Sequence, residues 1–184
     1  MTAESAEPPE SSMRIVDIRE TAIPLKSDLR NSGFDFSEMT TSVVAVITDV
    51  IRDGKPVAGF AFNSTGRYAC GAQMRARFIP RILAAKPEAL LDDSGNNLDP
   101  AKILACMMQR EKSGGHSERS IAIGAIEVAA WDAVAKIAGQ PLHHLLQAFG
   151  VQPGDADQDF VQEVRLSSHA LNQSNLIQPR MDTN

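Results

Sequence analysis

The hydrophobic pattern of this chain changes its period once, near Gly71, and this change constrains the fold more than any other feature. Before it, β-branched and apolar residues partly alternate in three short runs, at residues 13–25, 41–51 and 56–63. After it, apolar residues recur with a helical period, most regularly at residues 120–146. Alternation is typical of strands and the longer period of helices. The sequence therefore predicts an α+β fold: a three-stranded antiparallel sheet followed by a bundle of three to four helices.

Several local signals predict where these elements begin and end. Asp53 and Gly54 separate the second and third runs and predict a tight hairpin. A helix is expected over residues 100–111, after a capping aspartate and a proline. Gly139 predicts the end of the long helix, with a short helix after it. Pro80 lies inside a helical pattern, so we expect a kink or an early break there.

Composition excludes several classes of protein. The hydrophobic share of 43% and the charged share of 22% are ordinary for a globular chain. No apolar run approaches the roughly 18 residues of a membrane span, and no basic stripe favours nucleic acid. The two cysteines, Cys70 and Cys106, lack the spacing of paired metal ligands. Together with the lack of a secretory signal, they favour a reducing cytoplasm.

The distribution of charge and turn-forming residues suggests three regions. Residues 1–12 are acidic and rich in proline and serine, which is typical of a disordered leader. Residues 13–150 carry all the regular hydrophobic patterns and form the expected domain. Residues 151–184 have little periodicity and an excess of acidic residues, so we expect a weakly ordered tail.

No metal site is predicted. Asp155, Asp157 and Asp159 have the spacing of the start of a calcium loop, but the glycine and the closing glutamate of such a loop are missing. His116 and Glu118 lie two residues apart without a third ligand nearby, so loop capping or an ion pair is expected instead.

Five segments carry a family resemblance. In chain order they are TTSVVAVITDV, GFAFNSTGRY, NNLDPAKI, EKSGGHSERS and AAWDAVAKIAGQPL. Together they resemble the N-terminal capping domain of the enolase superfamily, in the mandelate racemase and muconate-lactonizing branch. Within that branch they are most similar to acid-sugar dehydratases of the D-tartrate dehydratase type. The resemblance covers residues 13–150.

The resemblance implies a division of labour. In this superfamily the cap closes over a modified TIM barrel and supplies two loops that select the substrate. The barrel supplies a Lys-x-Lys base, three acidic ligands for Mg²⁺ and a His-Asp pair, and the reaction implied here is elimination of water from a hydroxy-acid. This chain has no Lys-x-Lys and only 34 residues after Gly150. We therefore expect a cap without its barrel, with no catalytic or metal residues of its own and no activity alone.

The same resemblance places five residues at the substrate. Asn31 belongs to the first specificity loop, Asn63, Thr65 and Arg67 to the second, and Lys112 to the segment before the long helix. Amide, guanidinium and ammonium groups suit the hydroxyls and carboxylates of a hydroxy-acid. The residues alone also allow a plainer interpretation, in which the asparagines form turns and the lysine is a solvated surface residue.

A second hypothesis for the function is not enzymatic. A cap without its barrel would expose the apolar surface that the barrel normally covers. It would then form homo-oligomers, or dock on a barrel supplied by another chain. We expect no membrane and no nucleic-acid partner in either case.

Overall fold

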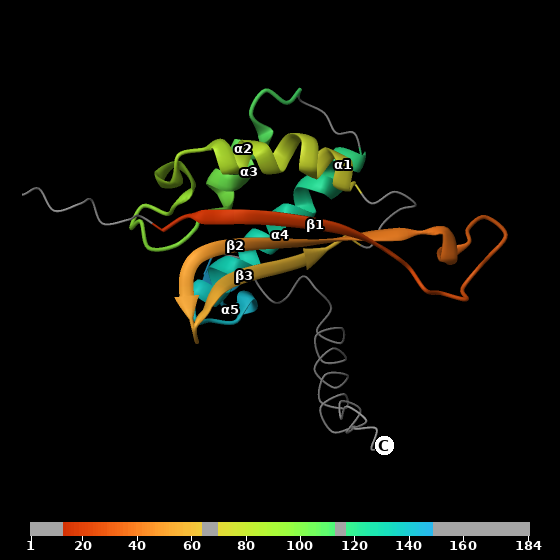
Figure 1. Cartoon of the computed structure of the whole chain (residues 1–184), viewed down its shortest axis with the longest axis horizontal. Coiled ribbons are helices and arrows are strands. Elements are labelled where there is room, and N and C mark those ends of the chain that lie inside the picture. The colour runs from red at the N-terminus through yellow and green to blue at the C-terminus, as the bar shows by residue number, and fades with distance from the viewer. Residues whose placement is uncertain (1–12, 64–69, 113–116, 149–184) are drawn as a thin grey trace, which may run out of the picture. The chain divides into compact units, whose positions relative to one another are not determined.

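The computed structural model describes residues 13–63, 70–112 and 117–148, and it confirms the α+β fold (Figure 1). The strands β1 (Ile15–Pro24), β2 (Thr40–Arg52) and β3 (Lys55–Phe62) form an antiparallel sheet in the order β1-β2-β3. The α-helices are α1 (Gly71–Gln73), α2 (Ile79–Ala84), α3 (Pro100–Met108), α4 (Ser117–Ala138) and α5 (Leu142–Ala148). Shorter segments are the 3₁₀ turns η1 (Phe36–Glu38) and η3 (Pro87–Leu90) and the π-helical segment η2 (Met74–Phe78).

The predicted hairpin between β2 and β3 is confirmed. Arg52 pairs with Lys55, so only two residues form the turn. Asp53 has a φ of 52° and Gly54 a φ of 73°. Two central residues with positive φ are what a two-residue turn needs if it is to match the twist of its strands, and aspartate and glycine tolerate this conformation.

Pro80 does not break the helix, contrary to the expectation of an early break. The chain is helical from the start of α1 to the end of α2, with η2 between them. The backbone N–H of Ile79 donates to the carbonyl of Met74, five residues earlier. Pro80, which has no N–H to donate, therefore lies in the first turn of α2, where it is tolerated.

Helix α3 begins as predicted and ends three residues earlier than predicted. The Asp99 carboxylate accepts hydrogen bonds from the N–H groups of Ala101 and Lys102, at 2.9 and 3.2 Å. At the other end Arg110 has a φ of 61°, a left-handed conformation that stops a helix. A non-glycine residue seldom takes this conformation, so the hydrophobic period alone gave no sign of the earlier end.

Helix α4 ends where the sequence predicted. Gly139 has a φ of 65° and its N–H donates to the carbonyl of Lys136 at 3.2 Å. The N–H of Gln140 donates to the carbonyl of Ala135 at 3.0 Å. This pair of bonds is the Schellman arrangement, and Gly139 supplies the left-handed residue that it requires.

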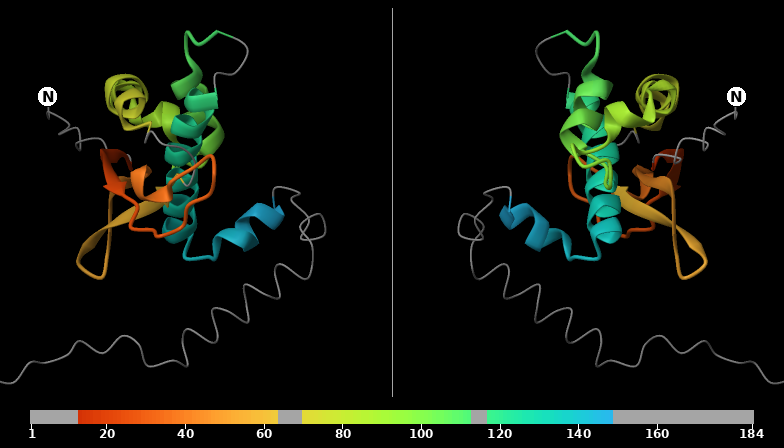
Figure 2. Two further views of the ribbon diagram at one scale, coloured as in Figure 1. Left: turned by 90° about the vertical axis from the view of Figure 1, so that its right-hand side faces the viewer. Right: turned by 90° about the vertical axis from the view of Figure 1, so that its left-hand side faces the viewer.

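Helix α4 packs directly on the sheet through small residues, and it runs along the face of β2 and β3 (Figures 1 and 2). A β-carbon added to Gly59 would lie 2.8 Å from the β-carbon of Ala133, and closer still to the backbone of Ala129 and Ala133. The alanines of α4 that are at most 5% exposed are Ala122, Ala125, Ala129, Ala130, Ala133 and Ala135. Glycine on the strand and alanine on the helix thus let the two backbones approach closely.

The outer edge of β3 is covered by side chains of α4. The N–H of Phe60 donates to the Asp132 carboxylate at 2.7 Å, and the Lys136 ammonium donates to the carbonyl of Ala58 at 3.0 Å. Asp132 and Lys136 also form an ion pair at 2.6 Å. The backbone groups that an edge strand would otherwise leave unpaired are satisfied at these two positions.

The chain divides into two units, the first ending at Leu142 and the second starting at His143. Most of α5 belongs to the second unit. Among the described residues, no helix is both long and apolar enough to span a membrane. The predicted leader, residues 1–12, and the predicted tail, residues 151–184, lie outside the described residues.

Candidate functional site

The loop that carries Asn31 and the end of β3, which leads to Asn63, lie at the same end of the sheet (Figure 1). Residues 25–39 connect β1 to β2, whose ends pair there through Pro24 and Thr40. Strand β3 ends beside them, because the Thr41 hydroxyl donates to the carbonyl of Asn63. Burial raises the pKa of the Cys70 thiol, and the nearby charge of Glu118 raises it further. The start of α4 therefore lies close to the start of α1.

Asn31 forms a turn in the first of these segments. Its side-chain oxygen accepts hydrogen bonds from the N–H groups of Gly33 and Phe34, at 2.9 and 2.8 Å. The neighbouring residues Arg30 and Asp35 form an isolated antiparallel bridge. The side-chain oxygen of Asn31 therefore stabilises a turn, as the plainer interpretation predicts. The residue itself is exposed.

The same loop exposes apolar side chains that the sequence analysis did not single out. Leu29 is 71% exposed, Phe34 55% and Phe36 37%. Hydrogen bonds between the backbones of Phe36 and Leu29, at 3.1 Å, and of Asn31 and Phe34, at 2.9 Å, hold this loop as a small hairpin. The sequence shows these side chains as isolated apolar residues within a polar loop, and this pattern could have indicated an exposed apolar surface.

Asn63 completes the pairing of β3 with β2. Its N–H donates to the carbonyl of Ser42 at 3.1 Å, and its side-chain oxygen accepts from the N–H of Ser42 at 2.8 Å. The residue is only 7% exposed. Its amide nitrogen Nδ2 is buried and finds no hydrogen-bond partner within the described part of the chain. The side-chain oxygen of Asn63 therefore has a structural role, whereas its Nδ2 group has no hydrogen-bond partner among the described residues.

Thr65 and Arg67, the other two residues of the second loop, lie outside the described residues. Lys112 is described and exposed. Its main-chain carbonyl accepts a hydrogen bond from the Arg119 guanidinium at 3.0 Å. Across residues 13–63, 70–112 and 117–148, no hydrogen bond joins the side chains of Asn31, Asn63 and Lys112 to one another.

A buried carboxylate beside this end of the sheet was not predicted from the sequence. The Glu20 side chain is fully buried, forms an ion pair with Arg75 and accepts a hydrogen bond from the Ser42 hydroxyl at 2.6 Å. Gly71 lies against it, and a β-carbon there would overlap the carboxylate. Glu20 therefore joins β1, β2 and the first helical segment. Its inward position could have been found from its spacing of two residues from the buried Ile18.

A second buried carboxylate lies next to Lys112. The Glu111 side chain is fully buried and pairs with Arg77 at 2.6 Å, Arg81 at 2.8 Å and Arg119 at 3.3 Å. The hydrogen bond from Arg81 and the charges of Arg77 and Arg81 hold the pKa of Glu111 below its ordinary value of 4.5. No pattern in the sequence indicates this cluster, since its arginines come from η2, α2 and α4 whereas Glu111 follows α3.

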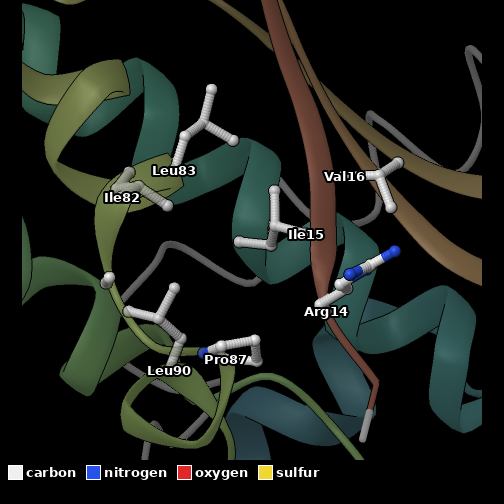
Figure 3. A pocket seen from close by; sticks show the side chains of 8 residues that line it. Arg14, Ile15, Val16, Ile82, Leu83, Pro87 and Leu90 are labelled. Atoms are coloured by element: carbon white, nitrogen blue, oxygen red, sulfur yellow. The ribbon is translucent and has the colours of Figure 1, made fainter. Parts of the chain in front are cut away.

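Two clefts in the described part of the domain lie elsewhere. One, of about 340 Å³, is lined by residues of β1, α2 and η3 (Figure 3). Ile15 points into it toward Ile82 and Leu90, and all its lining side chains except that of Arg14 are apolar (Figure 3). Another, of about 330 Å³, lies at the β2–β3 hairpin beside Arg52 and Lys136. Neither cleft contains a residue that the sequence placed at the substrate.

The described residues do not form a metal site. Among them, no group of three or more histidine, cysteine, aspartate or glutamate side chains is arranged to hold a metal ion. The Mg²⁺ that the resemblance implies therefore has no donor set in this part of the chain, and we assign no chemical step through a metal to these residues.

Known proteins resemble this chain in structure and in sequence. A solved structure of a mandelate racemase/muconate lactonizing enzyme-like protein from Rubrobacter xylanophilus is similar, with 18% sequence identity and a TM-score of 0.46. The match covers 70% of this chain and 32% of that one, so the chain spans about a third of the length of that protein. Residues 43–147 match the family model of the mandelate racemase / muconate lactonizing enzyme N-terminal domain. This match extends over more than half of the chain, which therefore belongs to that family of the enolase superfamily.

Proposed function

We propose that this domain is the substrate-selecting cap of an acid-sugar dehydratase of the D-tartrate dehydratase type, and that it is inactive by itself. The observation that carries the proposal is the family match, which covers the segment from β2 to α5. The described residues offer binding groups and no metal donor set. In this proposal a barrel domain carries out a Mg²⁺-dependent elimination of water from a hydroxy-acid, and the cap selects the substrate.

Lys112 is the residue of the cap that we propose to face a substrate carboxylate. Its side chain is exposed, while its backbone is held by Arg119. An ammonium group is a compact charge that suits a carboxylate. Asn31, Asn63, Thr65 and Arg67 would supply further contacts. For Asn63, the remaining group is the buried Nδ2, which has no hydrogen-bond partner among the described residues.

The loop at residues 25–39 supports docking on a barrel. Leu29 and Phe34 are more than half exposed, which is unfavourable in water and becomes favourable if a partner surface covers them. The loop projects from the sheet (Figure 1). We therefore propose that it inserts at the mouth of the barrel.

The proposal is tested by mixing the purified full chain with the separately produced barrel domain of a D-tartrate dehydratase and Mg²⁺. Formation of keto-acid is then followed with a panel of acid sugars that includes both tartrate enantiomers. We expect no turnover from the chain alone, and turnover of D-tartrate with both components. Lys112→Ala should lower kcat/KM by about 10- to 100-fold, the value of one hydrogen bond to a charged group.

The exposed Lys55 at the β2–β3 hairpin provides a matched control, because Lys55→Ala removes a lysine far along the sheet from the proposed site. If Lys112→Ala and Lys55→Ala have the same effect, the assignment of Lys112 is wrong. Turnover by the chain alone that survives rigorous purification would place the chemistry in this chain and refute the cap-only proposal.

A non-enzymatic dimerising role is the second candidate, and the outer face of the sheet favours it. Phe60 is 54% exposed and Phe62 69%. They lie opposite Ala45 and Val43 on β2, so they extend an apolar surface across two strands. Sedimentation equilibrium of the full chain and of Phe62→Ser tests this role. A dimer that the substitution dissociates supports it, and a monomer at all concentrations contradicts it.

We also propose a cytoplasmic location. The chain has only two cysteines, Cys70 and Cys106, and both are buried. Few cysteines in a chain of this length are typical of reducing compartments, which supports this location. Microscopy of the chain fused to a fluorescent protein tests it, and export from the cytoplasm would contradict it.

A further inference from the structure

The chain makes an unusual turn between α3 and Lys112. Helix α3 stops at Met108, and Arg110 takes a φ of 61° although it is not glycine. The N–H of Glu111 then donates to the carbonyl of Met108 at 3.0 Å. A non-glycine residue stays in this conformation only where the surrounding structure fixes it, and such positions cluster near functional sites.

The Glu111 carboxylate is what fixes the turn. It is fully buried, and Arg81 donates both to it at 2.8 Å and to the carbonyl of Met107 at the end of α3 at 2.6 Å. Arg77 holds the other carboxylate oxygen at 2.6 Å. Two arginines of the preceding helical segments therefore anchor Glu111.

Arg119 connects this anchor to Lys112. Its guanidinium lies 3.3 Å from the same Glu111 oxygen that Arg77 contacts, and it donates to the carbonyl of Lys112 at 3.0 Å. The Arg119 side chain is only 9% exposed. A planar guanidinium has several donors in fixed directions, so one arginine can hold a carboxylate and a carbonyl at once.

We propose that Arg119 is a positioning residue, which fixes the backbone of Lys112 so that its ammonium is presented to a carboxylate ligand. The hydrogen bond from Arg119 to the Lys112 carbonyl is called the tether below. The ligand part of this inference rests on the proposed function, whereas the tether does not. The flexible lysine stem would otherwise sample many directions, and fixing its origin lowers the entropy lost on binding. The tether acts through the backbone, so Arg119 itself does not need to touch the ligand.

A purely structural role for Arg119 is the alternative, and Arg77 provides the matched control. Both arginines contact the same oxygen of Glu111, but only Arg119 bonds to Lys112. Arg77→Gln therefore disturbs the buried carboxylate and leaves the hydrogen bond to Lys112 in place, whereas Arg119→Gln disturbs both. Arg119→Lys keeps a positive charge near Glu111, but a single ammonium lacks the forked donors, so this variant loosens the tether if the glutamine variant fails to fold.

The tether is tested on the full chain by limited proteolysis with trypsin. Cleavage after Lys112 requires its carbonyl oxygen to enter the oxyanion hole of the protease, and Arg119 holds that oxygen. Mass spectrometry gives the rate at this bond relative to the bond after the exposed Lys26. We expect Arg119→Gln and Arg119→Lys to raise the relative rate about tenfold and Arg77→Gln to change it less than about twofold. Equal rates in all three variants would overturn the proposal, provided that far-UV circular dichroism shows each to be folded.

The ligand part is tested in the barrel-supplemented assay. We expect Arg119→Lys to raise KM for the hydroxy-acid about tenfold and to change kcat less than about twofold, the pattern of lost ground-state binding. An unchanged KM in a variant whose tether is lost overturns the positioning role while Lys112→Ala still reports on the proposed function. A proportional fall in kcat with Arg77→Gln and Arg119→Lys alike would indicate a structural effect and also overturn it.

Discussion

The close approach of α4 to β3 gives the sharpest test of this fold. We predict that Gly59→Ala destabilises the domain strongly, because the added methyl group would lie 2.8 Å from the Ala133 β-carbon and closer to the backbone of Ala129 and Ala133. Overpacking a core costs about 1–3 kcal/mol when side chains can adjust. Here the nearest atoms belong to the backbone of a helix, so we expect the upper end, about 3 kcal/mol. For a domain of this size that corresponds to a fall in Tm of roughly 10 °C.

The assay is urea unfolding of the full chain, followed by far-UV circular dichroism. Gly124→Ala is the matched control, since Gly124 lies within α4 and a β-carbon there would have no atom within 4 Å. Replacing a helical glycine by alanine should stabilise the protein by up to about 1 kcal/mol. The double variant Gly59→Ala with Ala133→Gly removes the contact between β-carbons only, so we expect less than half of the loss to be recovered.

A change of less than about 0.5 kcal/mol for Gly59→Ala would refute the reasoning, because surface substitutions commonly have effects of that size. It would mean that α4 does not lie against β3 at this position. We expect Gly59→Ala to lower the free energy of unfolding and Gly124→Ala to raise it. This difference in sign shows that the effect at Gly59 comes from the close contact and not from a general preference for glycine.

Three further predictions concern single side chains. Arg110→Gly should raise the urea midpoint. Relief of the left-handed conformation stabilises the fold by roughly 1–2 kcal/mol, and the greater conformational entropy of glycine in the unfolded chain removes about 0.5–1 kcal/mol of this gain. A lower midpoint would contradict this prediction. Asn63→Ala should cost about 1–3 kcal/mol in urea unfolding, since the buried N–H of Ser42 loses its acceptor, and an unchanged stability would show that this bond is absent. Burial raises the pKa of Glu127, so its charged form destabilises the fold at neutral pH and the deficit fades as pH falls through that raised pKa. Glu127→Gln should therefore raise Tm at pH 7 and lose this advantage at pH below the ordinary value of 4.5, whereas a gain independent of pH would point to another cause.

The strand pattern and the turn chemistry were readable from sequence because each depends on neighbours along the chain. The alternation in β2, and the pair Asp53 and Gly54 after it, encode their own geometry. Gly139 likewise predicts the end of α4 from its own freedom to adopt a positive φ. Of the kink or early break expected at Pro80, the early break is absent, because the π-helical segment before it, which has no clear sequence signature, adjusts the hydrogen-bond register.

The polar networks could not be predicted, since they depend on contacts between distant segments. Glu111 draws its three arginine partners from two regions of the chain, and Glu20 is 55 residues from Arg75. Of the residues placed at the substrate, Asn31 forms the turn that its residue type suggests, whereas the hydrogen bonds of Asn63 to Ser42 depend on strand pairing that residue type alone does not reveal. The resemblance indicated the correct family, while substrate contact at these positions stays a prediction.

The covered edge of β3 affects how this domain can associate with its own copies. Asp132 and Lys136 occupy the backbone groups of Phe60 and Ala58 that a strand from another molecule would need for pairing. Continuous growth of the sheet past this edge, as in amyloid fibrils, is therefore opposed by two charged side chains that would have to be displaced. The folded domain can therefore present apolar residues on the outer face of its sheet and still resist this route to aggregation, because the protection comes from a single helix.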